Sequence, residues 1–174
     1  MRSVFPPFGS VLEIGCGFGR ITKLVLSQFP NIQKYTAMDI SPHQIKNASE
    51  YVIGVSDGID IQFIVSDIKS LQVTEQYDLV LAAEVLLHVL PSEITDIIAK
   101  LVGLSSRHII NVDYYLEKVT ALAPHNFLHQ YEKIYNAIPS IREVKRLPIR
   151  KQGILGFDTK QSIFHAVRTE SNSS

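Results

Sequence analysis

The stretch LEIGCGFGR, residues 12–20, places three glycines at alternate positions directly after an apolar run. Glycine destabilises a helix or strand by about 0.5–1 kcal/mol relative to alanine. We therefore expect Gly15, Gly17 and Gly19 where the backbone must come close to a ligand. Residues 11–14 read as a buried strand, and 20–29 have the apolar spacing of a helix. The stretch thus predicts a strand, a ligand-binding loop and a helix.

The composition is that of a globular domain with a substantial core. Of 174 residues, 45% are hydrophobic and 20% charged, and 17 basic residues balance 17 acidic ones. Zero net charge gives no indication of nucleic-acid binding through bulk electrostatics. Cys16 is the only cysteine, which excludes an intrachain disulfide. Since no apolar run approaches the roughly 20 residues of a membrane span, we expect no membrane association and a cytoplasmic location.

Short apolar runs alternate with helical stretches along the rest of the chain. Further strands are expected at 34–39, 61–65, 77–83 and 107–112, and helices at 42–52, 91–102 and 130–137. Ser41-Pro42 and Pro91 are typical of helix starts. The first five strands are largely continuous apolar runs, as in a parallel sheet covered on both faces. Two last strands, 142–149 and 161–168, are expected to form an antiparallel hairpin. We expect one domain, residues 1–174, with a short extension at 1–9 and a disordered tail at 170–174.

The glycine loop lies where an open parallel sheet binds its ligand, beyond the carboxyl end of a strand and before a helix N-terminus. A dinucleotide loop, G-x-G-x-x-G, would need glycine where Arg20 stands. The pattern present is E-x-G-x-G-x-G, from Glu13 to Gly19. It resembles the first motif of the class I S-adenosylmethionine-dependent methyltransferases, which implies a Rossmann-like, doubly wound α/β sheet of seven strands with helices on both faces.

The resemblance extends from about residue 11 to 113 and includes YDLVLAAEVLLHV, residues 77–89. It implies S-adenosylmethionine as cofactor, with the glycine loop at its methionine end. Asp39 would accept the ribose hydroxyls, and Asp67 would read the adenine amino group with Ile68 against the ring. The cofactor-binding residues that the resemblance implies are Glu13, Gly15, Cys16, Gly17, Gly19, Asp39, Ile40, Asp67, Ile68 and Glu84.

The catalytic candidates are Glu84 and His88, after the strand expected to end beside the transferable methyl. They are four residues apart and would share a face if that loop were helical. His88 is either a general base for a hydroxyl acceptor or a wall of the pocket. The spacing loosely resembles small-RNA 2′-O-methyltransferases, which bind a divalent metal with two Glu and two His, but Leu87 replaces the second Glu. The metal candidates, with no metal as the main expectation, are Glu84, His88, His125 and His129.

The sequence gives few indications of the methyl acceptor. The chain has neither an Asn-Pro-Pro-Tyr sequence nor a Pro-Cys pair after the fourth strand, which disfavours methylation of nucleic-acid bases. An oxygen acceptor on a small molecule, a glycan or an RNA ribose is favoured. The aromatic segment 114–131 is either a substrate wall or packing for a connecting helix. Two other functions stay open: a non-catalytic, cofactor-binding partner subunit and, less favoured, an NAD-dependent oxidoreductase.

Overall fold

The first predicted strand, β1 (Ser10–Ile14), lies inside a seven-stranded sheet of order β3-β2-β1-β4-β5-β7-β6. The computed structural model describes residues 8–72, 74–115, 123–150 and 158–169. The other elements are α1 (Arg20–Gln28), β2 (Lys34–Asp39), α2 (Pro42–Tyr51), β3 (Asp60–Val65), β4 (Tyr77–Ala83), the 3-10 helix η1 (Leu86–His88), α3 (Ile94–Leu104), β5 (Ser105–Tyr114), α4 (Tyr131–Asn136), β6 (Ile141–Arg150) and β7 (Asp158–Arg168).

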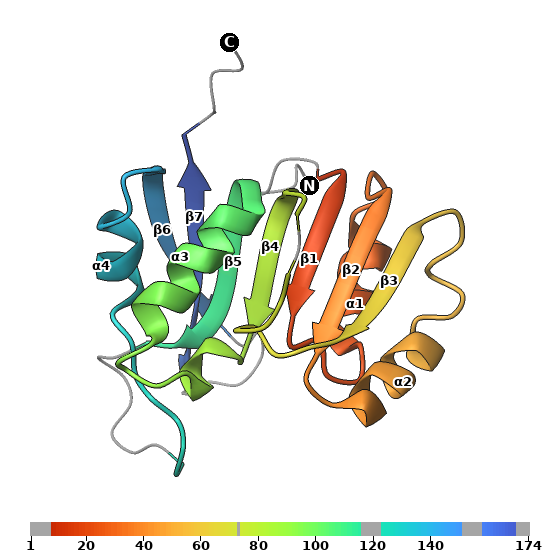
Figure 1. Cartoon of the computed structure of the whole chain (residues 1–174), viewed down its shortest axis with the longest axis horizontal. Helices are drawn as coiled ribbons and strands as arrows, with labels where there is room; N and C mark the ends of the chain where they lie inside the picture. Colours follow the sequence, from red (N-terminus) through yellow and green to blue (C-terminus); the bar gives the residue numbers. More distant parts are fainter. Residues whose placement is uncertain (1–7, 73, 116–122, 151–157, 170–174) are drawn as a thin grey trace.

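The five strands from β1 to β5 are parallel, and β7 pairs antiparallel with both β5 and β6. Figure 1 shows β1 to β4 ending at the same edge of the sheet, with β7 running the opposite way. The predicted mixed sheet is therefore confirmed, and β7 is inserted between β5 and β6. The chain moves outward from β1 to β3 and then returns to β4, so the strand order reverses between β1 and β4. Such a reversal opens a crevice at the carboxyl ends of the strands.

Helices cover both faces of the sheet, as predicted. In Figure 1, α3 lies in front of the strands, α4 lies at the left edge beside β6, and α1 lies behind the sheet. Alternate residues of each strand point to opposite faces of the sheet and belong to two separate apolar cores. Leu12 and Ile14 pack on the α3 side, while Val11 packs with Leu26 of α1. This alternation follows from the two-residue period of a strand. Because both cores are apolar, the sheet is a rigid base for the loops at its edge.

Two helix starts were predicted from proline, and only one begins as predicted. Pro42 is the first residue of α2, and the Ser41 hydroxyl accepts a hydrogen bond from the Gln44 N–H at 3.3 Å. The prediction for 91–102 is wrong at its start, because α3 begins at Ile94. The Leu90 carbonyl accepts from the N–H groups of Glu93 and Ile94, so a turn precedes the helix.

The edge strand β3 also departs from the expectation of a continuously buried run. Its burial alternates, and Val65 is 50% exposed, because only β2 pairs with it. At the start of the described chain, Phe8 is buried against Phe29. Most of the predicted extension and the tail lie outside the described residues, as does the hairpin turn at 151–157. None of the described helices is long and apolar enough to cross a membrane.

Candidate functional site

A cleft of about 510 Å³ opens at the carboxyl ends of β1 to β4. This volume lies within the usual range for a site that binds a small molecule or cofactor. Every contributing segment follows a strand, as expected for the switch point of an open α/β sheet. The lining residues are Ile14, Gly15, Met38, Asp39, Ile40, Ser66, Asp67, Ile68, Lys69, Ala83, Glu84, Val85, His88, Val89, Leu90 and Glu93.

The three glycines of the loop have different tasks. Gly15 lines the cleft with φ +68°, and a Cβ added there would lie 2.4 Å from the Val85 side chain. Gly19, with φ +90°, packs its backbone on Ala48 of α2, where an added Cβ would lie 3.1 Å from the Ala48 Cα. Gly17 donates its N–H to the Asp39 carboxylate at 2.9 Å. Gly15 therefore forms the floor of the cleft, while Gly17 and Gly19 do not line it and fix the loop from behind.

Glu13 and Cys16, two predicted cofactor contacts, lie under the loop rather than in the cleft. The Glu13 carboxylate is buried and accepts hydrogen bonds from the Thr22 hydroxyl and, at 2.8 Å, from the Tyr35 hydroxyl. Burial raises the pKa of Glu13, and the two hydroxyls oppose that shift. Burial likewise raises the pKa of the Cys16 thiol to about 12. Glu13 thus joins α1 to β2 beneath the glycines, and Cys16 is an inert packing residue.

Asp39 and Asp67 do reach the cleft. Asp39 ends β2, and its two carboxylate oxygens accept from the N–H groups of Gly17 and Ser41, each at 2.9 Å. Asp67 follows β3 and accepts from the Lys69 N–H at 2.8 Å. A carboxylate has about four acceptor positions, so each keeps capacity for a ligand after these bonds. Ile40 and Ile68 adjoin them in the lining, and Ile40 is 69% exposed.

Glu84 and His88 both line the cleft, but the segment from one to the other is not a continuous helix, which was the condition for a shared face. Glu84 has a left-handed backbone, φ +58°, and donates its N–H to the Val112 carbonyl at 2.8 Å. Its carboxylate accepts a hydrogen bond from Gln161 of β7. The helical turn covers only Leu86–His88, so the chain bends sharply between the two residues. An acid and a histidine therefore face the cleft from a bent strand end.

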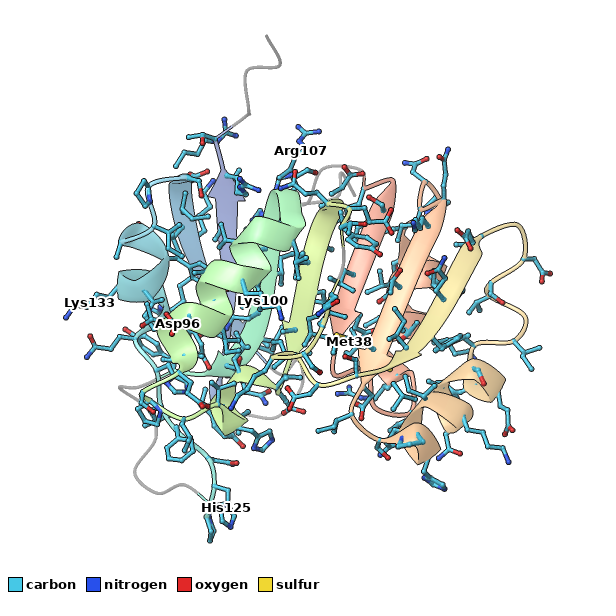
Figure 2. The ribbon with its side chains drawn as sticks, in the orientation of Figure 1. Met38, Asp96, Lys100, Arg107, His125 and Lys133 are labelled. Atoms are coloured by element: carbon cyan, nitrogen blue, oxygen red, sulfur yellow. The ribbon has the colours of Figure 1, made fainter. Side chains whose placement is uncertain are left out.

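The two downstream histidines are not brought to the cleft. His129 is buried next to Tyr131 and lines a separate cavity of about 210 Å³. Figure 2 places His125 at the tip of a loop, far from Met38 at the foot of β2. The four metal candidates are therefore not brought together in one site. Across the described ranges, no three His, Cys, Asp or Glu side chains are grouped so that they could hold a metal ion.

Two tyrosines of the aromatic segment 114–131 pack against neighbouring side chains. Tyr131 is buried against Phe164, with ring centroids 4.9 Å apart. The Arg146 guanidinium lies 3.7 Å from the centroid of the Tyr115 ring. Neither tyrosine lines the cleft, and residues 116–122 lie outside the described ranges.

Several polar groups are buried in the second half of the sheet, away from the cleft. Asp113 is fully buried on β5, and burial raises its pKa to about 7. It accepts a hydrogen bond from Asn111, which in turn accepts from the Tyr135 hydroxyl at 2.9 Å. On the opposite face, ring nitrogens of His108 and His165 lie 3.1 Å apart, and burial lowers the pKa of both. These groups belong to the interior rather than to a ligand site.

Sequence reasoning did not predict more than half of the residues that line the cleft. The residues not predicted are Ile14, Met38, Ser66, Lys69, Ala83, Val85, Val89, Leu90 and Glu93. Their only sequence signal is position, because each stands at the carboxyl end of a parallel strand or in the connection that follows one. Apolar residues at such positions are indistinguishable from core residues until the fold is known.

The family is decided by the match of residues 11–107 to the methyltransferase domain model. The chain belongs to this methyltransferase family. The matched segment contains β1 to α3 and every residue that lines the cleft. Family membership disfavours the dinucleotide interpretation, in agreement with Arg20 in place of a glycine.

Two curated relatives match over shorter segments. Malonyl-(acyl-carrier protein) O-methyltransferase 1 of Ilyobacter polytropus is 35% identical over 71 residues, 41% of this chain and 25% of the relative. The ubiquinone biosynthesis O-methyltransferase of Rickettsia felis is 33% identical over 93 residues, 53% of this chain and 35% of the relative. The chain thus spans about a quarter to a third of the length of these relatives.

Solved methyltransferase structures share the fold over nearly the whole chain. The N-methyltransferase NodS of Bradyrhizobium japonicum superposes with a TM-score of 0.74 at 20% identity, covering 94% of this chain and 88% of that one. A small RNA methyltransferase gives a TM-score of 0.78 at 14% identity, covering 95% of this chain and 24% of that one. A magnesium protoporphyrin IX methyltransferase of Synechocystis, solved with bound cofactor, gives 0.67 at 21% identity, covering 94% and 71%. At such identities the likeness concerns the fold.

Proposed function

We propose that the chain binds S-adenosylmethionine in the cleft and transfers its methyl group to an oxygen acceptor. The observation that carries this proposal is the floor at Gly15, which an added Cβ would fill against Val85. Bare backbone in a concave site allows a ligand to approach the main chain closely. The carboxylates of Asp39 and Asp67 open onto the same cleft, beside Ile40 and Ile68.

These residues assign the two ends of the cleft to different parts of the cofactor. Asp39 has the capacity to accept two ribose hydroxyls, and Asp67 to accept the adenine amino group, with Ile68 against the ring. Gly15 would lie beside the methionine part. Bound S-adenosylmethionine would supply an electrophilic methyl group on its sulfonium. For this chemistry, the protein mainly aligns the acceptor with that methyl.

Glu84 and His88 would act at the acceptor end. A hydroxyl acceptor must lose its proton as its oxygen bonds to the methyl carbon, and the sulfur keeps the electrons of the broken bond. His88 faces the cleft and would take that proton as a general base. Glu84 lies before the sharp bend of the chain that precedes His88, and it would hold the acceptor. An oxygen acceptor is supported by the names of the two curated relatives, both O-methyltransferases.

The first test is ligand-induced stabilisation. S-adenosylhomocysteine should raise the melting temperature, since a ligand at 100 times its Kd adds about 2.7 kcal/mol to stability. NAD, tested alongside, should have no comparable effect. A larger shift with NAD would contradict the proposal. A shift with S-adenosylhomocysteine but no methyl transfer to any oxygen acceptor would favour the non-catalytic partner subunit instead.

We propose that the protein acts in the cytoplasm. Its single cysteine, Cys16, is buried and forms no intrachain disulfide, which agrees with a reducing compartment. The net charge of zero gives no indication of a nucleic-acid partner and does not exclude an RNA ribose as the acceptor.

A further inference from the structure

The segment after β3 forms one wall of the cleft without the support of a helix. Residues 66–76 connect β3 to β4, and their described part, 66–72 and 74–76, contains no helix. Ser66 to Lys69 nevertheless line the cleft and include Asp67. The position of this wall therefore depends on side-chain contacts with neighbouring elements.

Several contacts hold Lys69 and its neighbours against α3. Leu71 is buried in the core on the side of the sheet that α3 covers. Lys100, labelled on α3 in Figure 2, donates from its Nζ to the Lys69 carbonyl at 2.7 Å. The Lys69 N–H donates to Asp67 at 2.8 Å. The backbone N–H and carbonyl of Lys69 are thus both hydrogen-bonded, and its ammonium makes a separate contact.

The Lys69 ammonium pairs with a residue from another segment that lines the cleft. Its Nζ lies 2.8 Å from the Glu93 carboxylate, and both residues line the cleft. Glu93 belongs to the turn before α3, where its N–H donates to the Leu90 carbonyl at 2.9 Å. The ion pair therefore links the wall that follows β3 to the wall that follows β4.

We propose that the Lys69–Glu93 ion pair is a clasp across the cleft that slows dissociation of the bound cofactor. The inference rests on the proposed function, because it takes the cofactor to bind between these two walls. Lys69 and Glu93 are positioning residues: they act by holding the wall that carries Asp67. The side chains are 54% and 37% exposed, and exposed pairs are weak and sensitive to salt. The expected effect on the dissociation rate is therefore about two- to fivefold.

The test measures S-adenosylhomocysteine dissociation by surface plasmon resonance for Lys69→Met, Glu93→Gln and the double variant. The methionine keeps the backbone bonds of Lys69 and removes only its ammonium. Each single variant should dissociate about two- to fivefold faster, and the double variant no faster than the singles. Sodium chloride at about 0.5 M should accelerate dissociation from the unmodified chain and leave Lys69→Met unchanged.

The matched control is Lys34→Met. Lys34 pairs with Glu75 at 2.7 Å, the side chains are 28% and 48% exposed, and neither residue lines the cleft. The rate at which S-adenosylhomocysteine dissociates from Lys34→Met should equal the rate for the unmodified chain. An unchanged rate in Lys69→Met, or an equal acceleration in Lys34→Met, overturns the clasp while leaving the proposed function intact. Absence of binding to the unmodified chain and to Lys34→Met overturns the proposed function and the clasp with it.

Discussion

Asp39 and Asp113 occupy similar places in their strands and have opposite surroundings. Asp39 is the last residue of β2, and Asp113 is the last but one of β5. Asp39 is half-buried at the cleft, with two backbone N–H groups as partners. Asp113 is fully buried and bonded to Asn111. The difference shows that an acid at a strand end is available to a ligand only where no neighbouring element covers that end.

The same contrast separates the two halves of the sheet. Every cleft residue comes from β1 to α3 or the loops between them, the segment that the family model matches. From β5 onward, several buried polar residues pair with one another, as His108 does with His165 and Asn111 with Asp113. We therefore expect substitutions in the first half to change ligand binding, and buried polar substitutions in the second half to change the response of stability to pH.

The largest effect is expected for His88→Ala, at the boundary between the halves. Loss of a general base should lower the methyl-transfer rate by about 10²–10⁴ once an acceptor is identified. Cofactor affinity should stay within a few-fold, because His88 lies at the acceptor end. The measurement is single-turnover kinetics together with S-adenosylhomocysteine binding. His43→Ala, an exposed histidine on α2, serves as control. Full activity in His88→Ala would show that His88 lines the pocket without acting as a general base.

Gly15→Ala tests the floor of the cleft. A left-handed backbone costs a non-glycine residue about 1–2 kcal/mol, and Val85 is a stiff, β-branched side chain that must also move. We expect S-adenosylhomocysteine affinity to fall by more than about tenfold, measured by calorimetry. Gly54→Ala carries the same backbone strain at φ +88° with no atom within 4 Å of the added Cβ. Its affinity should be unchanged; an equal loss in both variants would assign the effect to general destabilisation.

In the second half, acid should weaken the fold through His108. Burial lowers the pKa of folded His108 to about 4, below an ordinary value of about 6.5. Between these values the unfolded chain binds a proton that the folded chain does not, so stability falls as the pH falls. The cost is on the order of 3 kcal/mol. His108→Phe should lose less stability than the unmodified chain between pH 7 and pH 4.5 in urea unfolding.

Asp113→Asn should change the same profile in the opposite direction. The pKa of folded Asp113 is raised to about 7, so between about pH 4 and 7 the folded chain holds a proton that the unfolded chain releases. Asp113 therefore adds stability as the pH falls through that window. The asparagine variant lacks this gain and should lose more stability in acid than the unmodified chain. Parallel pH profiles for all three proteins would contradict this account of the second half.

Sequence reasoning succeeded where backbone chemistry decides the structure. The glycines after β1 and the Ser41-Pro42 pair predicted the loop and the start of α2, because few other residues suit those conformations. The strand-end acids Asp39 and Asp67 line the cleft, and their contact with a cofactor stays a prediction. It failed where tertiary contacts decide: Glu13 and Cys16 lie behind the loop, and the left-handed backbone of Glu84 separates it from His88. The ion pair of Lys69 with Glu93 joins residues 24 apart, which no local pattern indicates.

Calorimetric titration of S-adenosylhomocysteine into Asp39→Ala tests the central claim most directly. Asp39 opens onto the cleft at the end of β2, and loss of a charged acceptor should weaken binding by about 1.5–3 kcal/mol. The account predicts binding to the unmodified chain and to Asp60→Ala, an exposed acid at the other end of the neighbouring strand, with equal affinity. Asp39→Ala should bind about 10- to 100-fold more weakly. Equal affinity in all three proteins would contradict the placement of the cofactor in this cleft.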